Sequence, residues 1–302
     1  MYIGLWSRVQ GLGRGDLTRA LEDRAVVQGT LLRSTIHLVS AEDYWPAAVA
    51  VRDHRRRWWA AAHRRDPDAL DQVEAAAARV REALAGGPRR HSELVGEIGL
   101  DSTVWNGVNL WLDLVRVPPS GTWERRRADL YGLAEQWLPP GGSATEDEAL
   151  ELLVRRYLGG FGPARLNDVA NWAGVPAGVL GPVAARMVLR RFRSEGGAEL
   201  LDLPGAPLPD PDTPAPVRFL PTWDATLLAH ARRTQILPER FREHVFSTKN
   251  PQSIGTFLVD GRVAGSWQHD RARIVIGPFG RLDAAARRAL DEEVERLEAF
   301  HR

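Results

Sequence analysis

The region 80–203 contains the same order of predicted elements twice, and this repeat limits the possible folds more than any other feature of the chain. In each copy a helix leads through a Gly-Gly pair to a short helix, a single glycine (Gly99 or Gly174) and a second helix. In the first copy the second helix is predicted over 102–115, and the two closing strands over 116–123. In the second copy the helix is predicted over 176–190, and the strands over 191–201. This is the order of a winged helix, whose second helix can lie in a DNA major groove. Two copies in tandem indicate a chain that follows an extended duplex.

The region before the repeat is predicted to be mainly helical. A short helix is expected over 17–27, and the β-branched residues of 29–39 predict one strand. Ser40 has the position of an N-cap for a long helix that runs to about Arg65, and a second long helix is predicted over 71–84.

The clearest domain boundary is the segment 204–216, where six of thirteen residues are proline, so it must be an extended connector. Beyond it, Asp260-Gly261 predicts a hairpin turn, and Asp283 predicts the start of a final helix with Leu290, Val294 and Leu297 on one face. Strands are expected over 217–220, 253–259, 262–267 and 273–276.

These elements predict an α+β fold that is mainly helical, with tandem winged-helix domains followed by a β-rich C-terminal domain. The expected boundaries are an incomplete first winged helix plus a long helix over 1–70, a second winged helix over 71–140, a third over 141–203, the proline-rich linker 204–216, and the β-rich domain with its terminal helix over 217–302.

Composition excludes several classes of protein. The 302 residues include no cysteine, and the eight histidines show no metal-ligand spacing, so we expect neither a metal nor a cofactor. No apolar run reaches about 18 residues and the start lacks the features of a signal peptide, which predicts a cytoplasmic protein with no membrane contact. A net charge of +1 falls short of a typical nucleic-acid binder, so only local arginine clusters could serve DNA.

With these elements in place, the chain resembles the AlkZ-like DNA glycosylases, a winged-helix family associated with repair of alkylated bases. The similarity extends over nearly the whole length. The blocks that carry it are Tyr2-Ile-Gly-Leu-Trp-Ser-Arg8, Leu32-Arg-Ser-Thr-Ile-His-Leu-Val39 with Ala41-Glu-Asp43, Phe161-Gly-Pro-Ala164 with Asp168 and Trp172, Leu220-Pro-Thr-Trp-Asp224 with Leu227-Leu-Ala-His230, and Val259-Asp-Gly261 with Gly265-Ser-Trp267.

The resemblance implies double-stranded DNA as partner, a concave basic channel, and a monofunctional enzyme that excises N7-alkylated or crosslinked purines. The family's Gln-x-Gln or Gln-x-Asp motif would precede Tyr2, and Gln10 and Gln28 lie outside that frame, so the resemblance identifies no catalytic residue here. One explanation is truncation, which we favour because Leu5 and Trp6 start an apolar helix with no N-cap and no expected packing partner. The other is a non-catalytic DNA binder that shields lesions or regulates transcription.

Two groups of side chains are candidates for contacts with the lesion or the channel. Arg33, Thr35 and His37 alternate along the predicted strand and would share one face, although an ordinary solvent face with a hydrogen-bonded histidine is the alternative. In the C-terminal domain the candidates are Trp223, Asp224 and His230, for which a buried acid and histidine bonded to backbone is the alternative.

The best basic and aromatic cluster is the helical segment 54–65, where Trp58 and Trp59 lie among arginines. A solvated helix whose tryptophans pack on the next helix is the alternative. The predicted DNA-phosphate contacts are Arg55, Arg56, Arg57, Arg64, Arg65, Arg232 and Arg233.

Overall fold

The computed structural model describes residues 1–141, 144–230, 234–247 and 252–302, which fold into two units. Residues 17–204 form the larger unit, whereas residues 1–16 join residues 205–302 in the smaller one. Helix α2 (Arg14–Glu22) crosses the boundary and ends before the predicted limit, because Val26 and Val27 belong to a strand.

The larger unit contains a five-stranded antiparallel sheet in the order β2–β1–β4–β5–β3. Its strands are β1 (Val26–Thr30), β2 (Ile36–Ser40), β3 (Arg89–Arg90), β4 (Leu114–Arg116) and β5 (Leu130–Leu133).

The prediction of a single strand over 29–39 is wrong, because the chain reverses in the middle of that segment. A 3-10 turn, η1 (Leu32–Ser34), separates β1 from β2, and Gly29 pairs with His37 across the resulting hairpin. Arg33 and Ser34 have left-handed φ angles of 50° and 57°. Such angles are uncommon for residues other than glycine, which is why the sequence gives no turn signal here.

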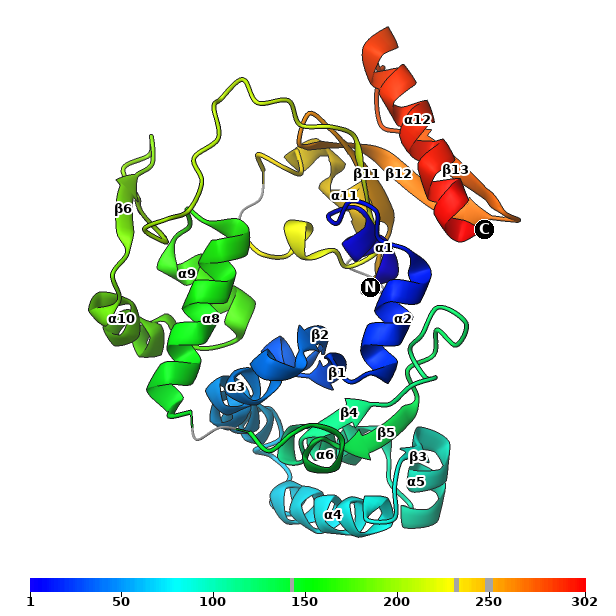
Figure 1. The fold of residues 1–302 in the computed structure, drawn as a ribbon. Helices are drawn as coiled ribbons and strands as arrows, with labels where there is room; N and C mark the ends of the chain where they lie inside the picture. Colours follow the sequence, from blue (N-terminus) through cyan, green and yellow to red (C-terminus); the bar gives the residue numbers. More distant parts are fainter. Residues whose placement is uncertain (142–143, 231–233, 248–251) are drawn as a thin grey trace. The chain divides into compact units, whose positions relative to one another are not determined.

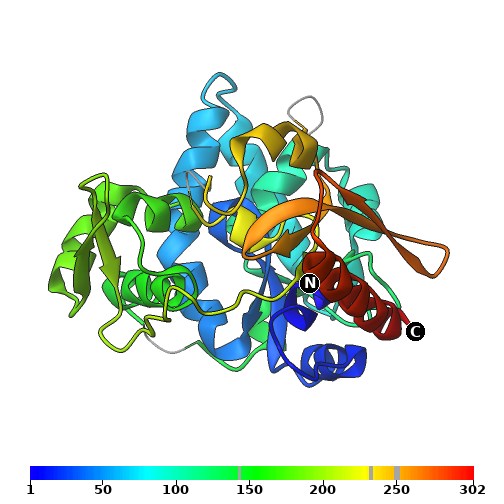
Figure 2. The same ribbon diagram turned by 90° about the horizontal axis from the view of Figure 1, so that it is seen from above.

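In the larger unit, a group of three helices followed by a pair of strands occurs twice. The two groups can be followed along the chain in Figures 1 and 2. The first group is α4 (Ala69–Leu84), α5 (His91–Ile98) and α6 (Ser102–Trp111), followed by β4 and β5. The second is α8 (Glu146–Phe161), α9 (Leu166–Ala173) and α10 (Ala177–Arg186), followed by β6 (Arg190–Arg193) and β7 (Glu199–Asp202). Both α6 and α10 end about four residues before their predicted limits.

The turn glycines have the same role in both groups. Gly99 ends α5 with φ of 74°, and Gly174 ends α9 with φ of 72°, so both helices stop at a residue in the left-handed region. Helix α3 (Ala41–Ala62) packs against α6 of the first group and α8 of the second. The Ser40 hydroxyl accepts a hydrogen bond from the Asp43 amide, which confirms the predicted N-cap.

One predicted strand of the repeat is not formed. The region 116–123 was expected to hold two strands, but β4 pairs with β5, which begins at Leu130. Residues 117–129 form a long loop between them, and the short helix α7 (Ala134–Trp137) follows β5. Two prolines and a glycine in the first five residues of this loop disfavour a strand there.

The smaller unit is built on a four-stranded antiparallel sheet in the order β13–β12–β11–β8. The strands are β8 (Arg218–Leu220), β11 (Gly255–Val259), β12 (Arg262–Asp270) and β13 (Arg273–Pro278), in agreement with the four predicted segments. Asp260 and Gly261 form the turn between β11 and β12, as predicted. Shorter elements are η2 (Ala225–Leu227), η3 (Glu239–Phe241), α11 (Arg242–Val245), β9 (Phe246–Ser247) and β10 (Gln252–Ser253).

Helix α12 (Ala284–His301) and the N-terminal helix α1 (Tyr2–Trp6) complete the core of the smaller unit. Asp283 caps α12 by accepting a hydrogen bond from the Ala286 amide, as predicted. The Trp6 ring packs against Phe300 at a centroid distance of 5.9 Å. The expectation that Trp6 has no packing partner is therefore wrong.

Within the described ranges, no helix combines the length and the apolar character needed to cross a membrane. In the same ranges, no three histidine, aspartate or glutamate side chains gather closely enough to hold a metal ion.

Candidate nucleic-acid interface

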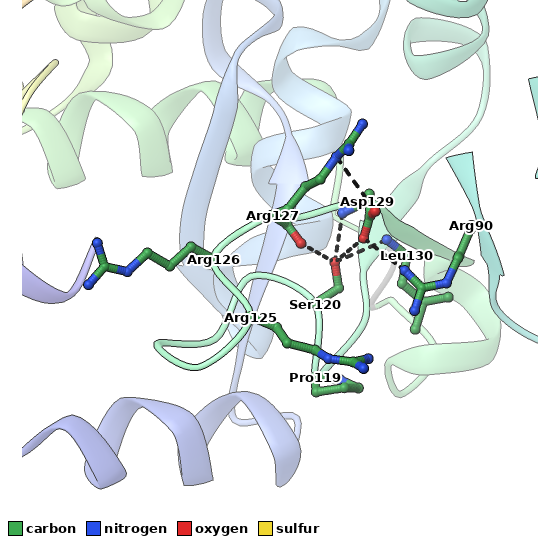
Figure 3. Close-up of a pocket in the computed structure, with 8 residues that line it drawn as sticks. All are labelled: Arg90, Pro119, Ser120, Arg125, Arg126, Arg127, Asp129 and Leu130. Atoms are coloured by element: carbon green, nitrogen blue, oxygen red, sulfur yellow. Dashed lines mark hydrogen bonds and ion pairs between the residues drawn. The ribbon is translucent and has the colours of Figure 1, made fainter. Parts of the chain in front are cut away.

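The loop 117–129, here called the arginine loop, presents three consecutive arginines on the larger unit. Arg125, Arg126 and Arg127 are all exposed. The base of the loop is closed by Ser120, whose hydroxyl accepts hydrogen bonds from the amides of Asp129 (2.6 Å) and Leu130 (3.0 Å) and donates to the Arg127 carbonyl (Figure 3). The arginines therefore extend from a loop whose base is joined by the hydrogen bonds of Ser120.

A pocket of about 340 Å³ lies against the arginine loop and is lined by its three arginines and by Arg90 (Figure 3). Asp129 is the acidic residue in this lining, with carboxylate oxygens 3.5 Å from Arg90 and 3.6 Å from Arg127. The Arg126 guanidinium points away from the other three arginines and lies over the Trp123 ring at 4.6 Å (Figure 3). Arg90, Arg125 and Arg127 against one carboxylate still leave a positive excess, so the pocket is suited to a phosphate.

Gln28 contacts the base of the arginine loop. It is buried in β1, and its side-chain amide donates to the carbonyl of Gly121 at 3.3 Å. Gly121 has φ of 79°, and a Cβ atom at this position would clash with the Gln28 amide. The loop thus depends both on a glycine and on a buried glutamine.

The hairpin β6–β7 is a second arginine-bearing segment that follows a helix group. Arg191 and Arg193 are exposed, and Arg190 lies over the Phe192 ring at 5.0 Å. Arg191 pairs with Glu199 at 2.7 Å, whereas Arg193 donates to the carbonyl of Gly197. Each helix group is thus followed by three arginines, which lie in the loop 117–129 after the first group and on strand β6 after the second.

The prediction that Arg55 contacts DNA phosphate is wrong. Its side chain is only 4% exposed, and it donates to the Thr30 carbonyl at 2.6 Å and to Asp113 at 3.2 Å. Burial lowers the pKa of Arg55, and the nearby Asp113 carboxylate opposes this shift. Arg55 joins α3 to the sheet and to the loop before β4, and so belongs to the core.

The other predicted phosphate contacts on α3 differ in exposure. Arg56 is half-buried and donates to the carbonyls of Leu110 and Trp111, where a cation stabilises the C-terminal end of α6. Arg57 is 74% exposed, with Asp53 at 3.9 Å, and Arg64 and Arg65 are also exposed. Arg232 and Arg233 lie outside the described residues.

The two tryptophans of α3 face different surroundings. Trp59 is buried and stacks on His63 at 4.1 Å, with Trp111 edge-on at 5.4 Å. It therefore has the packing role that was the alternative for this cluster. Trp58 is 63% exposed.

Arg33, Thr35 and His37 do not share the face of one strand, because Arg33 lies in the turn η1. Arg33 donates to the Trp172 carbonyl at the end of α9, and its backbone packs on Gly174. The Thr35 hydroxyl and His37 Nε2 both bond to the Leu32 carbonyl, at 3.1 Å each, and lie 2.9 Å apart. The structure thus brings Thr35 and His37 together but directs Arg33 to α9.

His37 is uncharged at neutral pH. Burial lowers its pKa to about 4, with the Arg33 charge acting in the same direction and the bond to Leu32 opposing it. Since Nε2 must carry the proton to donate to a carbonyl, Nδ1 is a free acceptor. Among the described residues, no hydrogen-bond partner occupies Nδ1.

The candidates in the smaller unit have separate roles. Asp224 is buried, accepts two hydrogen bonds from Arg8 at 2.6 and 3.0 Å, and caps η2 through the Thr226 amide. This agrees with the alternative prediction for Asp224, which is a buried acid that bonds to backbone. Trp223 is half-exposed with φ of 58°, and its backbone amide donates to Ser253. His230 is half-buried.

Sequence analysis missed the arginine loop. The run Arg125-Arg126-Arg127 is visible in the sequence, but the prediction of a strand, turn and strand over 116–123 leaves no long loop before Leu130, where β5 begins. A run of arginines after a Pro-Pro-Ser-Gly segment was the available signal, since such loops display charge on the surface.

Comparison with known proteins gives one family and one solved structure. The model of the family described as DNA glycosylase AlkZ-like matches residues 1–300. The structure of the Streptomyces sahachiroi DNA glycosylase AlkZ is similar with a TM-score of 0.75 and 20% sequence identity, over 98% of this chain and 87% of that one. A search of curated proteins found no match.

Proposed function

This chain belongs to the AlkZ-like DNA glycosylase family, and from that membership we propose that it excises alkylated bases from double-stranded DNA. The match of the family model to residues 1–300 is the observation that carries the proposal. DNA binding and a place among DNA-repair hydrolases follow from the family itself. The alkylated substrate and the duplex form of the DNA are our proposal.

We interpret the two helix groups as winged helices that lie along the duplex. In this arrangement the arginine loop and the hairpin β6–β7 are the wings, and α6 and α10 are the helices that approach the grooves. The three arginines on each wing support this interpretation, because phosphate contacts supply most of the affinity of proteins for DNA. Within the predicted region 1–70, residues 1–16 belong to the smaller unit, so β1, β2 and α3 would form part of a further winged helix.

The chemistry suits an enzyme without a strong acid. An N7-alkylated purine carries a positive charge, so the glycosidic bond breaks toward an oxocarbenium-like state without protonation of the base. The protein must then unstack the nucleotide, stabilise charge and hold a water molecule. We propose His37 as a contact to the lesion nucleotide, because its neutral ring has a free acceptor at Nδ1. Trp223 is a further candidate contact, on the smaller unit.

Release of free base from methylated DNA tests the proposal. The full chain is incubated with duplex DNA that contains 7-methylguanine, and the released base is quantified by chromatography. We expect release above the rate of spontaneous loss, and none of the unmodified guanine. Binding to the duplex without release would instead make the chain a non-catalytic lesion binder. Absence of both would contradict the proposal.

A further inference from the structure

A second pocket, of about 720 Å³, lies in the larger unit between α3 and the turn that joins α9 to α10. It is larger than the pocket of the arginine loop, and the proposed contacts with the duplex do not use it. Its lining includes His54, Arg57 and Trp58 from α3, and Asn167 and Asn171 from α9.

Trp58 is the main feature of this pocket, because tryptophan is the largest side chain and the residue is 63% exposed. A solvent-facing tryptophan loses the free energy that burial of its apolar surface would give. Trp59, the next residue, is buried in the core, so the exposure of Trp58 does not result from a general lack of packing along α3. The ring offers a flat surface on which a base can stack.

The polar groups around Trp58 suit a nucleotide. The Arg57 guanidinium is 74% exposed. Ala177, the first residue of α10, also lines the pocket, and no side chain caps this helix. The Val179 amide donates to the Pro176 carbonyl, which leaves the N–H groups of Ala177 and Gly178 for an anion. None of the described residues that line the pocket is acidic.

The opposite wall provides hydrogen-bonding groups for a base edge. Asn167 and Asn171 are four residues apart, so their exposed amides lie on the same face of α9. His54 adds a side chain that is only 8% exposed, and among the described residues its Nε2 has no hydrogen-bond partner, with Glu146 at 3.9 Å. An aromatic ring, a cation and amides on one pocket are the components of single-strand nucleotide sites.

We propose that this pocket binds an unstacked nucleotide of DNA, with the base on the Trp58 ring and the phosphate near Arg57 and the first turn of α10. The inference goes beyond the proposed function, which places the lesion nucleotide at His37 and gives this pocket, whose lining does not include His37, no ligand. It explains why an exposed tryptophan, an exposed arginine and two asparagines converge on one pocket.

The test uses DNA that contains 2-aminopurine, whose fluorescence falls when the base stacks on an aromatic ring. The full chain is titrated with a single strand, a duplex with a bulged 2-aminopurine and a fully paired duplex. We expect quenching with the first two DNAs. Trp58→Ala should remove the quenching and weaken binding to these DNAs by about 5- to 150-fold, the range for one base–aromatic stack. Affinity for the paired duplex should stay within about twofold.

Three variants make the test specific. Trp58→Phe keeps a ring and should retain quenching, whereas Asn171→Ala should weaken binding of the bulged DNA without abolishing it. Arg79→Ala removes an exposed arginine on α4, outside the pocket, and should behave as the unaltered chain. Quenching that survives in Trp58→Ala would overturn the inference. Absence of quenching with every DNA would also overturn it, and would make a protein surface the better partner for Trp58. Neither result would contradict the proposed release of 7-methylguanine, which is measured in a separate experiment.

Discussion

Burial decides the role of each arginine on α3, and Arg55 and Arg57 are the clearest contrast. Removal of Arg55 would leave Asp113 with one partner fewer and the Thr30 carbonyl without its bond to Arg55. We expect Arg55→Ala to lower the free energy of unfolding by about 3 to 5 kcal/mol, and Arg57→Ala to change it by less than about 0.5 kcal/mol. Urea denaturation of both variants measures the difference. Equal stability of the two would show that Arg55 is not part of the core.

The uncharged state of His37 predicts a dependence of stability on pH. Its pKa is about 4 in the folded chain, below the ordinary value of 6.5, so the unfolded chain binds the proton more tightly. The contribution of neutral His37 to the free energy of unfolding is therefore present above pH 6.5 and is lost as pH falls toward 4. Between pH 7 and 5 the loss should be about 2 kcal/mol.

His37→Gln serves as the comparison for this effect, because glutamine can also donate to the Leu32 carbonyl but does not titrate. The variant should lose about 2 kcal/mol less than the unaltered chain over the same pH range. Parallel stability curves for the two chains would mean that His37 titrates normally.

The location of Arg55 could not be predicted from the sequence. Its partner Asp113 lies 58 residues away, and nothing in the segment 54–65 distinguishes Arg55 from Arg57. The pairing of Thr35 with His37 was closer to prediction, since the two residues are two positions apart, with Thr35 immediately before β2 and His37 within it. Arg33 is separated from them because it lies in the turn η1. The sequence gives no local signal for this turn, whereas in the structure Arg33 contacts Gly174 and the end of α9.

Among the elements, the arginine loop gives the sharpest prediction for DNA binding. Replacement of Arg125, Arg126 and Arg127 by alanine removes three exposed charges, so the slope of log affinity against log salt should fall by up to about 3 units. Stability should not change, since the side-chain bonds of Ser120 that hold the loop remain.

A matched control for the arginine loop removes the same charge elsewhere. Arg79, Arg287 and Arg288 are exposed on α4 and α12, and their joint replacement should change the salt slope much less. If the two triple variants bind alike, the loop has no special contact with DNA and the net charge of the protein sets the affinity.

The strands of the smaller unit were predicted more accurately than those of the larger one. β11 and β12 are adjacent in the sequence and joined by Asp260-Gly261, so their pairing is encoded locally. In contrast, β4 and β5 are separated by the loop 117–129, whose closure depends on Ser120 and on Gln28 from β1. Contacts between distant segments set this register, and no local pattern reports them.

For the whole molecule, the division into units predicts which part depends on the first helix. Trp6 packs on Phe300 and joins the core of the smaller unit. We expect Trp6→Ala to cost up to about 3 kcal/mol, and to accelerate hydrogen exchange in residues 205–302 but not in residues 17–204. Faster exchange throughout both units would show that they unfold as one.

The discontinuous smaller unit also has a consequence for synthesis on the ribosome. Domains generally fold as they emerge, the N-terminal part first. Here residues 1–16 leave the ribosome before the larger unit does, but their packing partners, among them Phe300, are translated after it. The larger unit can fold while translation continues, whereas Ile3 and Trp6 must wait with their apolar side chains exposed. During that interval, this short segment is the part of the nascent chain most open to chaperones.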